Sequence, residues 1–214
     1  VQTVPLANID DVFREVAAGS VNYGVVPVEN SSEGMVSHTL DSFLDSNLQI
    51  IGEVELRIHH HLLVSEGTQL KSISRIYSHQ QSLAQCRKWL DANFPKAERV
   101  AVSSNAEAAR RIKGEWHSAA IAGETAAELY GLNKLHERIE DNPNNTTRFL
   151  IIGRESVARC GDDKSSIIVS VRNNEAGALY SLLEPFYRRG INLTRIESRP
   201  SKHDVWTYVF FIDF

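Results

Sequence analysis

Two polar segments of this 214-residue sequence combine side chains and spacing that could bind an anion. Residues 28–34 (VENSSEG) leave an apolar run and enter a predicted helix, and residues 77–81 (YSHQQ) repeat that order. In open α/β sheets, ligands bind beyond the carboxyl ends of strands, near the free amides of a helix N-terminus. Ordinary helix caps would explain the serines of both segments equally well, so each segment alone leaves its role open.

A third segment, residues 145–149 (NTTRF), places hydroxyl groups beside a guanidinium just before another apolar run. Hydroxyl donors next to an arginine suit a carboxylate ligand. An asparagine-rich turn with a surface arginine is the alternative explanation for this segment taken alone.

The histidine run at residues 59–61 invites comparison with a metal site. Adjacent side chains of a strand point to opposite faces, so at most His59 and His61 could share an ion. No neighbouring cysteine or acidic residue completes a ligand set, and we therefore predict no metal site.

Alternating helices and strands are predicted to position these segments, which indicates an α/β architecture. Asn8 can cap a first helix and Gly19 can end it. The apolar run at residues 23–28 is typical of a strand buried on both faces of a parallel sheet. Further helices are predicted at residues 32–46, 81–92, 106–113 and 124–129, and further strands at 48–58, 62–64, 76–77, 99–102, 119–122 and 149–152.

The polar stretch at residues 155–164 is the predicted linker between a domain at residues 1–154 and a second domain at residues 165–214. In the second domain, strands are predicted at residues 167–171, 191–196 and 206–212, with a helix at 177–189. Pro185 is expected to kink that helix or make it irregular.

The composition does not favour a nucleic-acid-binding, membrane-spanning or disulfide-rich protein. Hydrophobic residues make up 42% and charged residues 23% of the chain, and the formal net charge is −4, without a basic stripe for nucleic acid. The longest apolar runs are too short to cross a bilayer. Cys86 and Cys160 lack CxxC spacing, so we expect reduced thiols in a cytoplasmic protein.

Taken together, these segments resemble the signatures of the prephenate dehydratase family. The first resembles its VPxENS signature, and Asn145-Thr146-Thr147-Arg148-Phe149 resembles its N-x-T-R-F motif. Tyr77-Ser78-His79, with Gln81 and Gln85, resembles its second active-site segment. The signatures of its regulatory ACT domain are resembled by Gly177-Ala178-Leu179 and Glu197-Ser198-Arg199-Pro200. All occur in family order along essentially the whole chain.

The resemblance implies a fold of two α/β lobes around a cleft, similar to type II periplasmic binding proteins, followed by an α+β ACT domain. The family usually opens with a Gly-Pro-x-Gly-Thr-(Phe/Tyr)-Ser strand and a helix, and its ACT domain runs β-α-β-β-α-β. We therefore expect an incomplete N-terminus, an ACT domain truncated at its C-terminus, and a sequence that is a piece of a longer one. An upstream chorismate mutase domain is not visible.

The implied reaction is the decarboxylative dehydration of prephenate to phenylpyruvate in phenylalanine biosynthesis, without a cofactor. Aromatisation drives it, so the protein must hold a dianion and stabilise a departing hydroxide. Thr147 is the candidate donor to the leaving hydroxyl. Arg148 either pairs with a substrate carboxylate or acts as a scaffold ion. The other candidate residues orient or contact the substrate: Asn30, Ser78, Gln85, Glu29, Ser31 and His79.

The implied regulation is inhibition by L-phenylalanine at the ACT domain. The candidate effector-binding residues are Gly177, Ala178, Leu179, Glu197, Ser198, Arg199 and Pro200. Exposed ACT sheet edges predict a homodimer or homotetramer. A non-catalytic solute-binding module or an amino-acid sensor is the alternative, and the sequence does not separate prephenate from arogenate as substrate.

Overall fold

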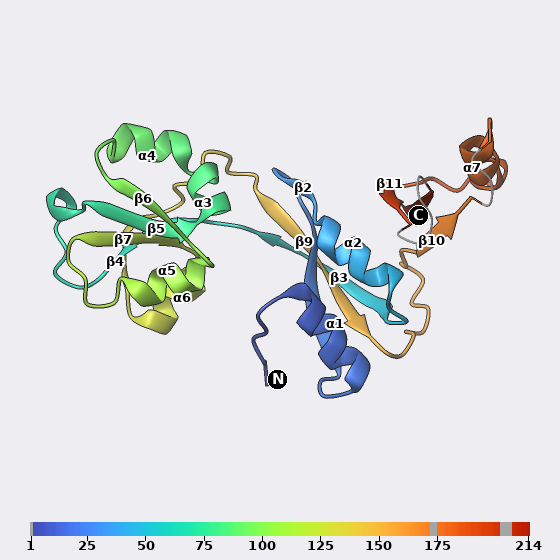
Figure 1. Ribbon diagram of the computed structural model, residues 1–214, viewed down its shortest axis with the longest axis horizontal. Helices are drawn as coiled ribbons and strands as arrows, with labels where there is room; N and C mark the ends of the chain where they lie inside the picture. The colour runs from blue at the N-terminus through green and yellow to red at the C-terminus, as the bar shows by residue number, and fades with distance from the viewer. Residues whose placement is uncertain (1, 172–174, 202–206) are drawn as a thin grey trace. The chain divides into compact units, whose positions relative to one another are not determined.

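The computed structural model describes residues 2–171, 175–201 and 207–214. The chain forms two compact units: unit 1 comprises residues 1–29, 35–54 and 148–214, and unit 2 comprises residues 30–34 and 55–147. Strands β1 (Tyr23–Asn30), β3 (Gln49–Arg57) and β9 (Thr146–Gly153) each continue from one unit into the other (Figure 1). The segments that carry Asn30 and Thr147 therefore lie where the chain changes units.

Unit 2 contains a mixed five-stranded sheet in the order β6-β5-β7-β4-β8. Strand β5 pairs in parallel with β6 and β7, whereas β4 pairs antiparallel with β7 and β8. The strands are β4 (His61–Val64), β5 (Arg75–His79), β6 (Glu98–Val102), β7 (Ser118–Ala122) and β8 (Asn133–His136), and a short 3-10 helix, η1 (Leu70–Ser72), precedes β5.

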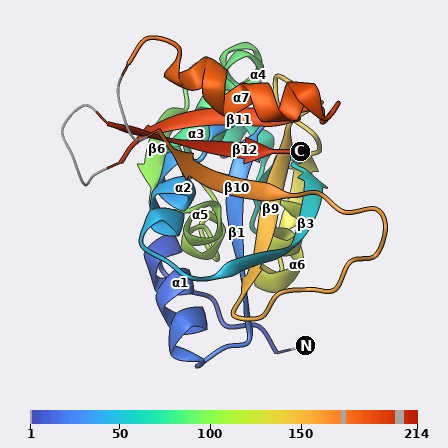
Figure 2. The same ribbon diagram turned by 90° about the vertical axis from the view of Figure 1, so that its right-hand side faces the viewer.

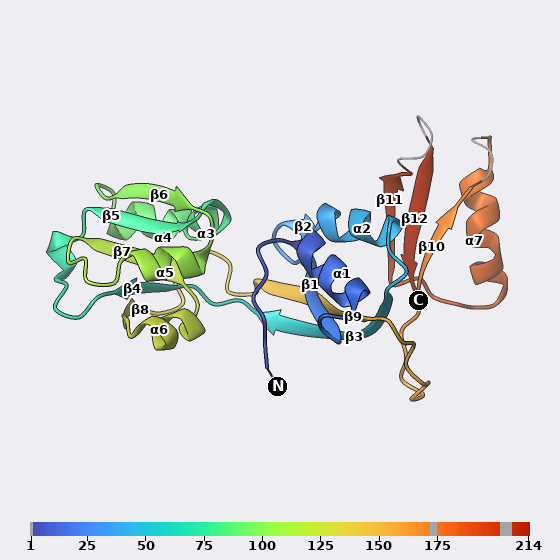
Figure 3. The same cartoon turned by 60° about the horizontal axis from the view of Figure 1, so that its bottom comes forward.

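Helices cover both faces of this sheet (Figures 1 and 3). On one face, α3 (Gln80–Gln85) and α4 (Arg87–Asn93) pack against the sheet through apolar side chains such as Leu90. On the other face, α5 (Asn105–Arg111) and α6 (Glu124–Tyr130) do the same. Strands β5, β6 and β7 lead into α3, α5 and α6, which brings polar helix starts to one edge of the sheet, where α/β proteins bind ligands.

Unit 1 contains the four-stranded sheet β2-β1-β9-β3, with β2 at Gly34–Met35. Helices α1 (Ile9–Ala18) and α2 (Ser37–Leu44) bury Phe13 and Phe43 against it. The predicted burial of the first strand on both faces is wrong. Val26 and Val28 are fully buried, but Tyr23 and Val25 on the opposite face are 66% and 58% exposed.

A second sheet in unit 1 has the antiparallel order β10-β12-β11. Its strands are β10 (Ser166–Ser170), β11 (Arg195–Pro200) and β12 (Tyr208–Asp213). Helix α7 (Ala178–Arg188) lies across one face (Figure 2), where Phe186 contacts the ring of Phe214. From the other face, Val209 and Phe211 of β12 enter the core formed by α1, α2, β1 and β9.

The first helix has the predicted caps, since Asn8 accepts a hydrogen bond from the Asp11 amide and Gly19 adopts the left-handed conformation. The helix predicted at residues 32–46 is wrong in its first turn. Gly34 has a φ of 81°, and the Val36 amide bonds back to the Val28 carbonyl, so the chain reverses before α2 begins at Ser37. Similarly, the helix predicted at residues 81–92 is divided at Cys86 into α3 and α4.

Strand β8 was not predicted, because residues 133–136 (NKLH) contain only one apolar side chain. The strand expected at residues 191–196 begins only at Arg195, since the Ile191 amide closes the end of α7 on the Phe186 carbonyl. Helix α7 continues through Pro185. Trp206, the first residue of the last predicted strand, lies outside the described residues.

Candidate active site

Asn30 and Thr147, both in unit 2, are in direct contact. Asn30 Oδ1 accepts hydrogen bonds from the backbone amides of Ser32 (2.9 Å) and Glu33 (3.1 Å). Because those amides can only donate, the orientation of the carboxamide is fixed, and Asn30 Nδ2 donates to Thr147 Oγ1 at 2.8 Å. Within the described residues this is the one hydrogen bond of the Thr147 hydroxyl, which therefore retains its own proton for another acceptor.

The same network includes Gln85. Asn30 Nδ2 also donates to Asn145 Oδ1 at 2.8 Å, and Asn145 Nδ2 donates to Gln85 Oε1 at 3.1 Å. The ring of His60 contacts Gln85 Oε1 at 2.8 Å. Asn145 and Thr147 are buried, with 2% and 9% exposure. Residues of the first and third segments thus meet Gln85 and His60 in one hydrogen-bonded cluster, which we call the amide network: Asn30, Gln85, Asn145, Thr147 and His60.

Ser31 fastens the first segment to the third. Its hydroxyl donates to the Asn144 carbonyl (3.1 Å) and accepts from the Thr146 amide (2.9 Å). Its own amide bonds to the Thr146 carbonyl at 2.9 Å. Ser31 therefore aligns the backbone that carries Thr147.

Ser78 is fully buried and faces protein groups in this structure. Its hydroxyl lies 2.8 Å from both Asn105 Oδ1 and the Ile121 carbonyl. Asn105 Oδ1 also accepts from the His79 amide, and its Nδ2 donates to Ser82. The His79 ring accepts from the Gln81 amide and so caps α3. These contacts hold the carboxyl end of β5 against the start of α5.

Arg148, the candidate carboxylate partner or scaffold ion, belongs to unit 1 and is surrounded by carboxylates. Its guanidinium lies 2.8 Å from Glu29, 2.9 Å from Glu53 and 3.5 Å from Asp213. Burial lowers the pKa of Arg148, but the carboxylates of Glu53, Glu29 and Asp213 outweigh that effect and raise the pKa. With its side chain only 11% exposed, Arg148 has the contacts of a scaffold ion.

Glu140 anchors the histidine run in unit 2. It accepts from His59 Nδ1 at 2.8 Å and from the His60 amide at 2.9 Å. Burial alone would raise the pKa of Glu140, but these hydrogen bonds hold it below its usual value. No group of three or more potential ligands suited to a metal ion occurs in the part of the chain that the structure describes.

The candidate effector residues fall into two places. Gly177, with a φ of 87°, precedes α7 and lines a cavity of about 300 Å³ together with Ala178 and Leu182. Glu197, Ser198, Arg199 and Pro200 lie in β11, which the central strand β12 separates from β10. Leu179 is 44% exposed. The lining of this cavity includes none of the four β11 residues among the described positions.

Arg199 instead binds α2. Its guanidinium contacts both carboxylate oxygens of Asp41, at 2.9 and 3.0 Å, and Nη1 donates to Ser37. These two hydrogen bonds to one carboxylate connect β11 to α2, the helix that packs on the four-stranded sheet of unit 1.

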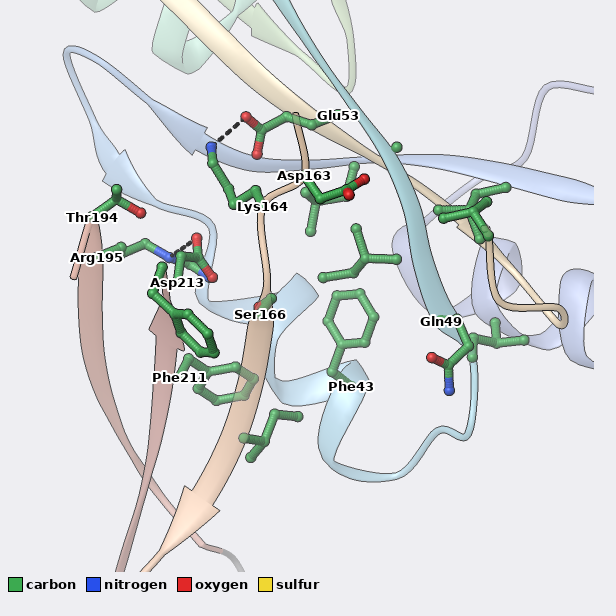
Figure 4. Close-up of a pocket in the computed structure, with 18 of the residues that line it drawn as sticks. Phe43, Gln49, Glu53, Asp163, Lys164, Ser166, Thr194, Arg195, Phe211 and Asp213 are labelled. Atoms are coloured by element: carbon green, nitrogen blue, oxygen red, sulfur yellow. Dashed lines mark hydrogen bonds and ion pairs between the residues drawn. The ribbon is translucent and has the colours of Figure 1, made fainter. Parts of the chain in front are cut away.

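A larger cavity of about 960 Å³ lies in unit 1 between α2 and β3 on one side and β10 and β12 on the other (Figure 4). Four of the charged groups that line it form ion pairs, with Lys164 2.6 Å from Glu53 and Arg195 2.8 Å from Asp213. None of the candidate catalytic residues is among the described residues that line it.

The sequence profile of the prephenate dehydratase family matches residues 1–157, and that of the ACT domain matches residues 165–214. The chain belongs to the prephenate dehydratase family. It is 69% identical over 212 residues to the bifunctional chorismate mutase/prephenate dehydratase of Pseudomonas aeruginosa, and covers 58% of that protein. The chain thus spans under three fifths of the length of this curated relative.

Solved structures confirm the predicted α/β fold class. A prephenate dehydratase from Arthrobacter aurescens, determined in complex with L-Phe, has a TM-score of 0.89 at 39% identity, covering 98% of this chain and 71% of that one. A protein described as GqqA, a quorum quenching acylase, has a TM-score of 0.87 at 29% identity, covering 98% of this chain and 77% of that one. No helix in the described ranges has both the length and the apolar character needed to span a membrane.

Several residues that hydrogen-bond to the candidate site residues, or form ion pairs with them, were not predicted from the sequence. Asn105 begins α5 beyond the carboxyl end of β6, next to β5, and that position could have been a signal. His60 lies in the histidine run, for which the sequence predicted no metal site and indicated no other role. Glu53 and Asp213 carry no motif, and only the folded structure shows that they reach Arg148.

Proposed function

We propose that this chain supplies prephenate dehydratase activity, converting prephenate to phenylpyruvate, carbon dioxide and water. The single observation that carries the proposal is the Thr147 hydroxyl, which accepts from Asn30 and keeps its proton free to donate. A buried, preoriented donor is what a departing hydroxide requires. Membership of the prephenate dehydratase family supports the choice of substrate.

In the proposed reaction, the bond between the ring and its carboxylate breaks and carbon dioxide leaves. The electron pair moves through the ring, the carbon–oxygen bond at the far ring carbon breaks, and the ring becomes aromatic. The leaving hydroxide takes up one proton, ultimately from solvent, and departs as water. Thr147 donates a hydrogen bond that strengthens as negative charge grows on that oxygen.

The other candidate residues take supporting roles in this proposal. Asn30 orients Thr147, and Gln85 presents its carboxamide beside them. Ser31, Ser78 and His79 hold the local backbone. Arg148 and Glu29 form an ion pair that stabilises the strands next to the site. A substrate contact by Glu29 or Arg148 would require that pair to open.

The direct test is an assay of the full-length protein with prephenate, following phenylpyruvate by its ultraviolet absorbance in alkali. We expect turnover that falls roughly a hundredfold to a thousandfold in Thr147→Val. The solute-binding alternative predicts binding of prephenate without product. Because GqqA is described as an acylase, an N-acylated substrate is included in parallel, and release of free amine at a rate exceeding phenylpyruvate formation would contradict the proposal.

We also propose that L-phenylalanine inhibits the activity by binding at the ACT domain. The free amides at the start of α7 suit its carboxylate, and the adjoining cavity of about 300 Å³ suits part of its side chain. The Arthrobacter aurescens relative was solved with L-Phe, which supports the choice of ligand. The candidate effector residues of β11 do not line that cavity. In this proposal, the β11 residues that complete the binding site come from a second copy of the chain.

That argument favours a homodimer or a homotetramer in which ACT sheets meet. Sedimentation should give an even oligomer at micromolar concentration, and calorimetry should show L-phenylalanine binding that Gly177→Val with Ser198→Ala abolishes. A monomer that still binds L-phenylalanine would exclude the shared site. The proposed division into residues 1–154, 155–164 and 165–214 predicts proteolytic cleavage within 155–164, and the cysteine spacing still favours a cytoplasmic location.

A further inference from the structure

The polarity of the amide network follows from two backbone groups. The amides of Ser32 and Glu33 donate to Asn30 Oδ1, so Asn30 Nδ2 must face Asn145 and Thr147. Asn145 then presents Oδ1 to Asn30, which leaves its Nδ2 to donate to Gln85 Oε1. Each carboxamide orientation is thereby fixed by the one before it.

His60 stands at the end of this sequence of hydrogen bonds. Gln85 Oε1 has no hydrogen to give, so the His60 nitrogen 2.8 Å away must donate, and Nε2 must carry the proton. This is the shortest side-chain contact of Gln85, compared with 3.1 Å to Asn145 and 3.4 Å to Glu33. The position of the Gln85 carboxamide therefore depends most directly on His60.

The surroundings of His60 keep its ring in place. The side chain is buried, with 3% of the residue exposed. The His60 amide donates to Glu140 Oε2 and the His60 carbonyl accepts from the Ile139 amide, each at 2.9 Å. Nδ1, the second ring nitrogen, is buried with no hydrogen-bond partner among the described residues. A buried unpaired nitrogen is unfavourable, so packing alone would favour an apolar side chain here.

We infer that His60 is a positioning residue for the proposed dehydration, holding Gln85 and, through Asn145 and Asn30, the Thr147 hydroxyl. It touches neither Thr147 nor, in this inference, the substrate. The intervening amides cannot relay a proton, so the network orients the site and does not conduct protons. The inference rests on the proposed function, because orientation matters only if Thr147 donates during the reaction.

The test compares His60→Leu with His60→Gln in the full-length protein. The glutamine variant retains an amide donor near the position of Nε2, whereas leucine fills similar volume without one. We expect His60→Leu to lower kcat roughly tenfold to a hundredfold, the size of effect that slight misplacement of a reacting group can produce, with KM changed less. His60→Gln should stay within about threefold of the parent, because its donor replaces Nε2.

A double-mutant cycle with Gln85→Leu measures the coupling. If His60 acts through Gln85, adding His60→Leu to Gln85→Leu should lower kcat little further. Multiplicative losses would overturn the inference, as would equal losses in His60→Gln and His60→Leu. A His60→Leu enzyme whose kcat lies within about threefold of the parent value would also overturn the inference.

One measurement stays valid if a variant does not fold or if the assay shows no dehydratase activity. Nitrogen-15 NMR of the parent protein distinguishes the two histidine tautomers. A proton on Nε2 of His60 supports the inference, and a neutral ring protonated on Nδ1 overturns it. Loss of activity in Thr147→Val with normal activity in His60→Leu would leave the proposed function intact and remove His60 from it.

Discussion

Thr147 and Arg148 are neighbours in the chain but belong to opposite kinds of cluster. Thr147 ends a stretch of unit 2 and lies in the amide network, which joins one hydroxyl, three carboxamides and an imidazole. Arg148 begins a stretch of unit 1 and, with the carboxylates of Glu29, Glu53 and Asp213, forms what we call the ion cluster. The amide network directs a single hydroxyl, whereas the ion cluster links several strands.

The two chemistries have different energetic consequences. A neutral hydrogen bond contributes about 1 kcal/mol to stability, so one can be lost without unfolding the protein. Removing one partner of a buried ion pair leaves an uncompensated charge and costs about 3–5 kcal/mol. We therefore expect changes in the amide network to act mainly on turnover, and changes in the ion cluster to act mainly on stability and regulation.

The largest expected effect is that of Thr147→Val. Losing one preorganised donor should lower turnover roughly a hundredfold to a thousandfold. Substrate affinity should change much less, because the bond strengthens mainly in the transition state. Thr147→Ser keeps a hydroxyl and is the matched control. Steady-state kinetics that place Thr147→Val within a small factor of the parent would exclude Thr147 from the mechanism.

A smaller loss is expected for Asn30→Asp, roughly tenfold to a hundredfold in kcat. The new carboxylate would still accept from the Ser32 and Glu33 amides, but it could not donate to Thr147. Thr147 would then give its own proton to the carboxylate and lose it as a donor to the substrate. Thermal unfolding serves as the control. Unchanged kcat in a folded Asn30→Asp protein would show that the direction of this hydrogen bond is irrelevant.

In the ion cluster, Arg148→Met should lower the free energy of unfolding by about 3 kcal/mol. The reason is that the Asp213 side chain, which is only 4% exposed, loses one of the two cations that neutralise its carboxylate. Arg195 remains beside Asp213 and limits the loss. Turnover should fall less than in Asn30→Asp. Arg148→Lys keeps the charge and is the control. Chemical denaturation checks the prediction, and a stability equal to that of the parent would contradict it.

The same variant tests regulation. Asp213 ends β12 of the ACT sheet, and Glu29 precedes Asn30 in β1, so Arg148 links the regulatory sheet to the segment that orients Thr147. Arg148→Met should weaken inhibition by L-phenylalanine while calorimetry shows binding retained, because the coupling free energy and not the effector site is altered. Loss of binding itself would mean that Arg148 supports the ACT fold.

The amide network shows how much a sequence can predict. Asn30, Gln85 and Thr147 were predicted because the short segments that carry them resemble the family's signatures. Asn105 and His60 were not, since their importance depends on contacts with residues 27 and 25 positions away, which no local pattern contains. Likewise, the helix predicted at residues 32–46 begins later than expected. The chain reverses at Gly34 and the Val36 amide bonds to the Val28 carbonyl, a contact that the apolar spacing of the sequence does not reveal.

The smallest expected effect is a difference in how the stabilities of the two units respond to acidification. In unit 2, burial first and then the charge of Lys134 lower the pKa of His61. The unfolded chain then binds a proton near pH 6.5 before the folded chain does, so stability is lost as the pH falls below that value.

In unit 1, burial alone would raise the pKa of Asp213, but hydrogen bonds from Arg195 and Ser166 lower it. That contribution is present above the unfolded pKa of about 3.9 and is lost as the pH falls through the folded pKa. Hydrogen exchange between pH 7.5 and 5.5 should therefore show loss of protection in unit 2 before unit 1. His61→Gln should remove most of this difference, because glutamine does not titrate. If the variant retains the parent's pH dependence, His61 is not its cause, and another group in unit 2 must bind the proton.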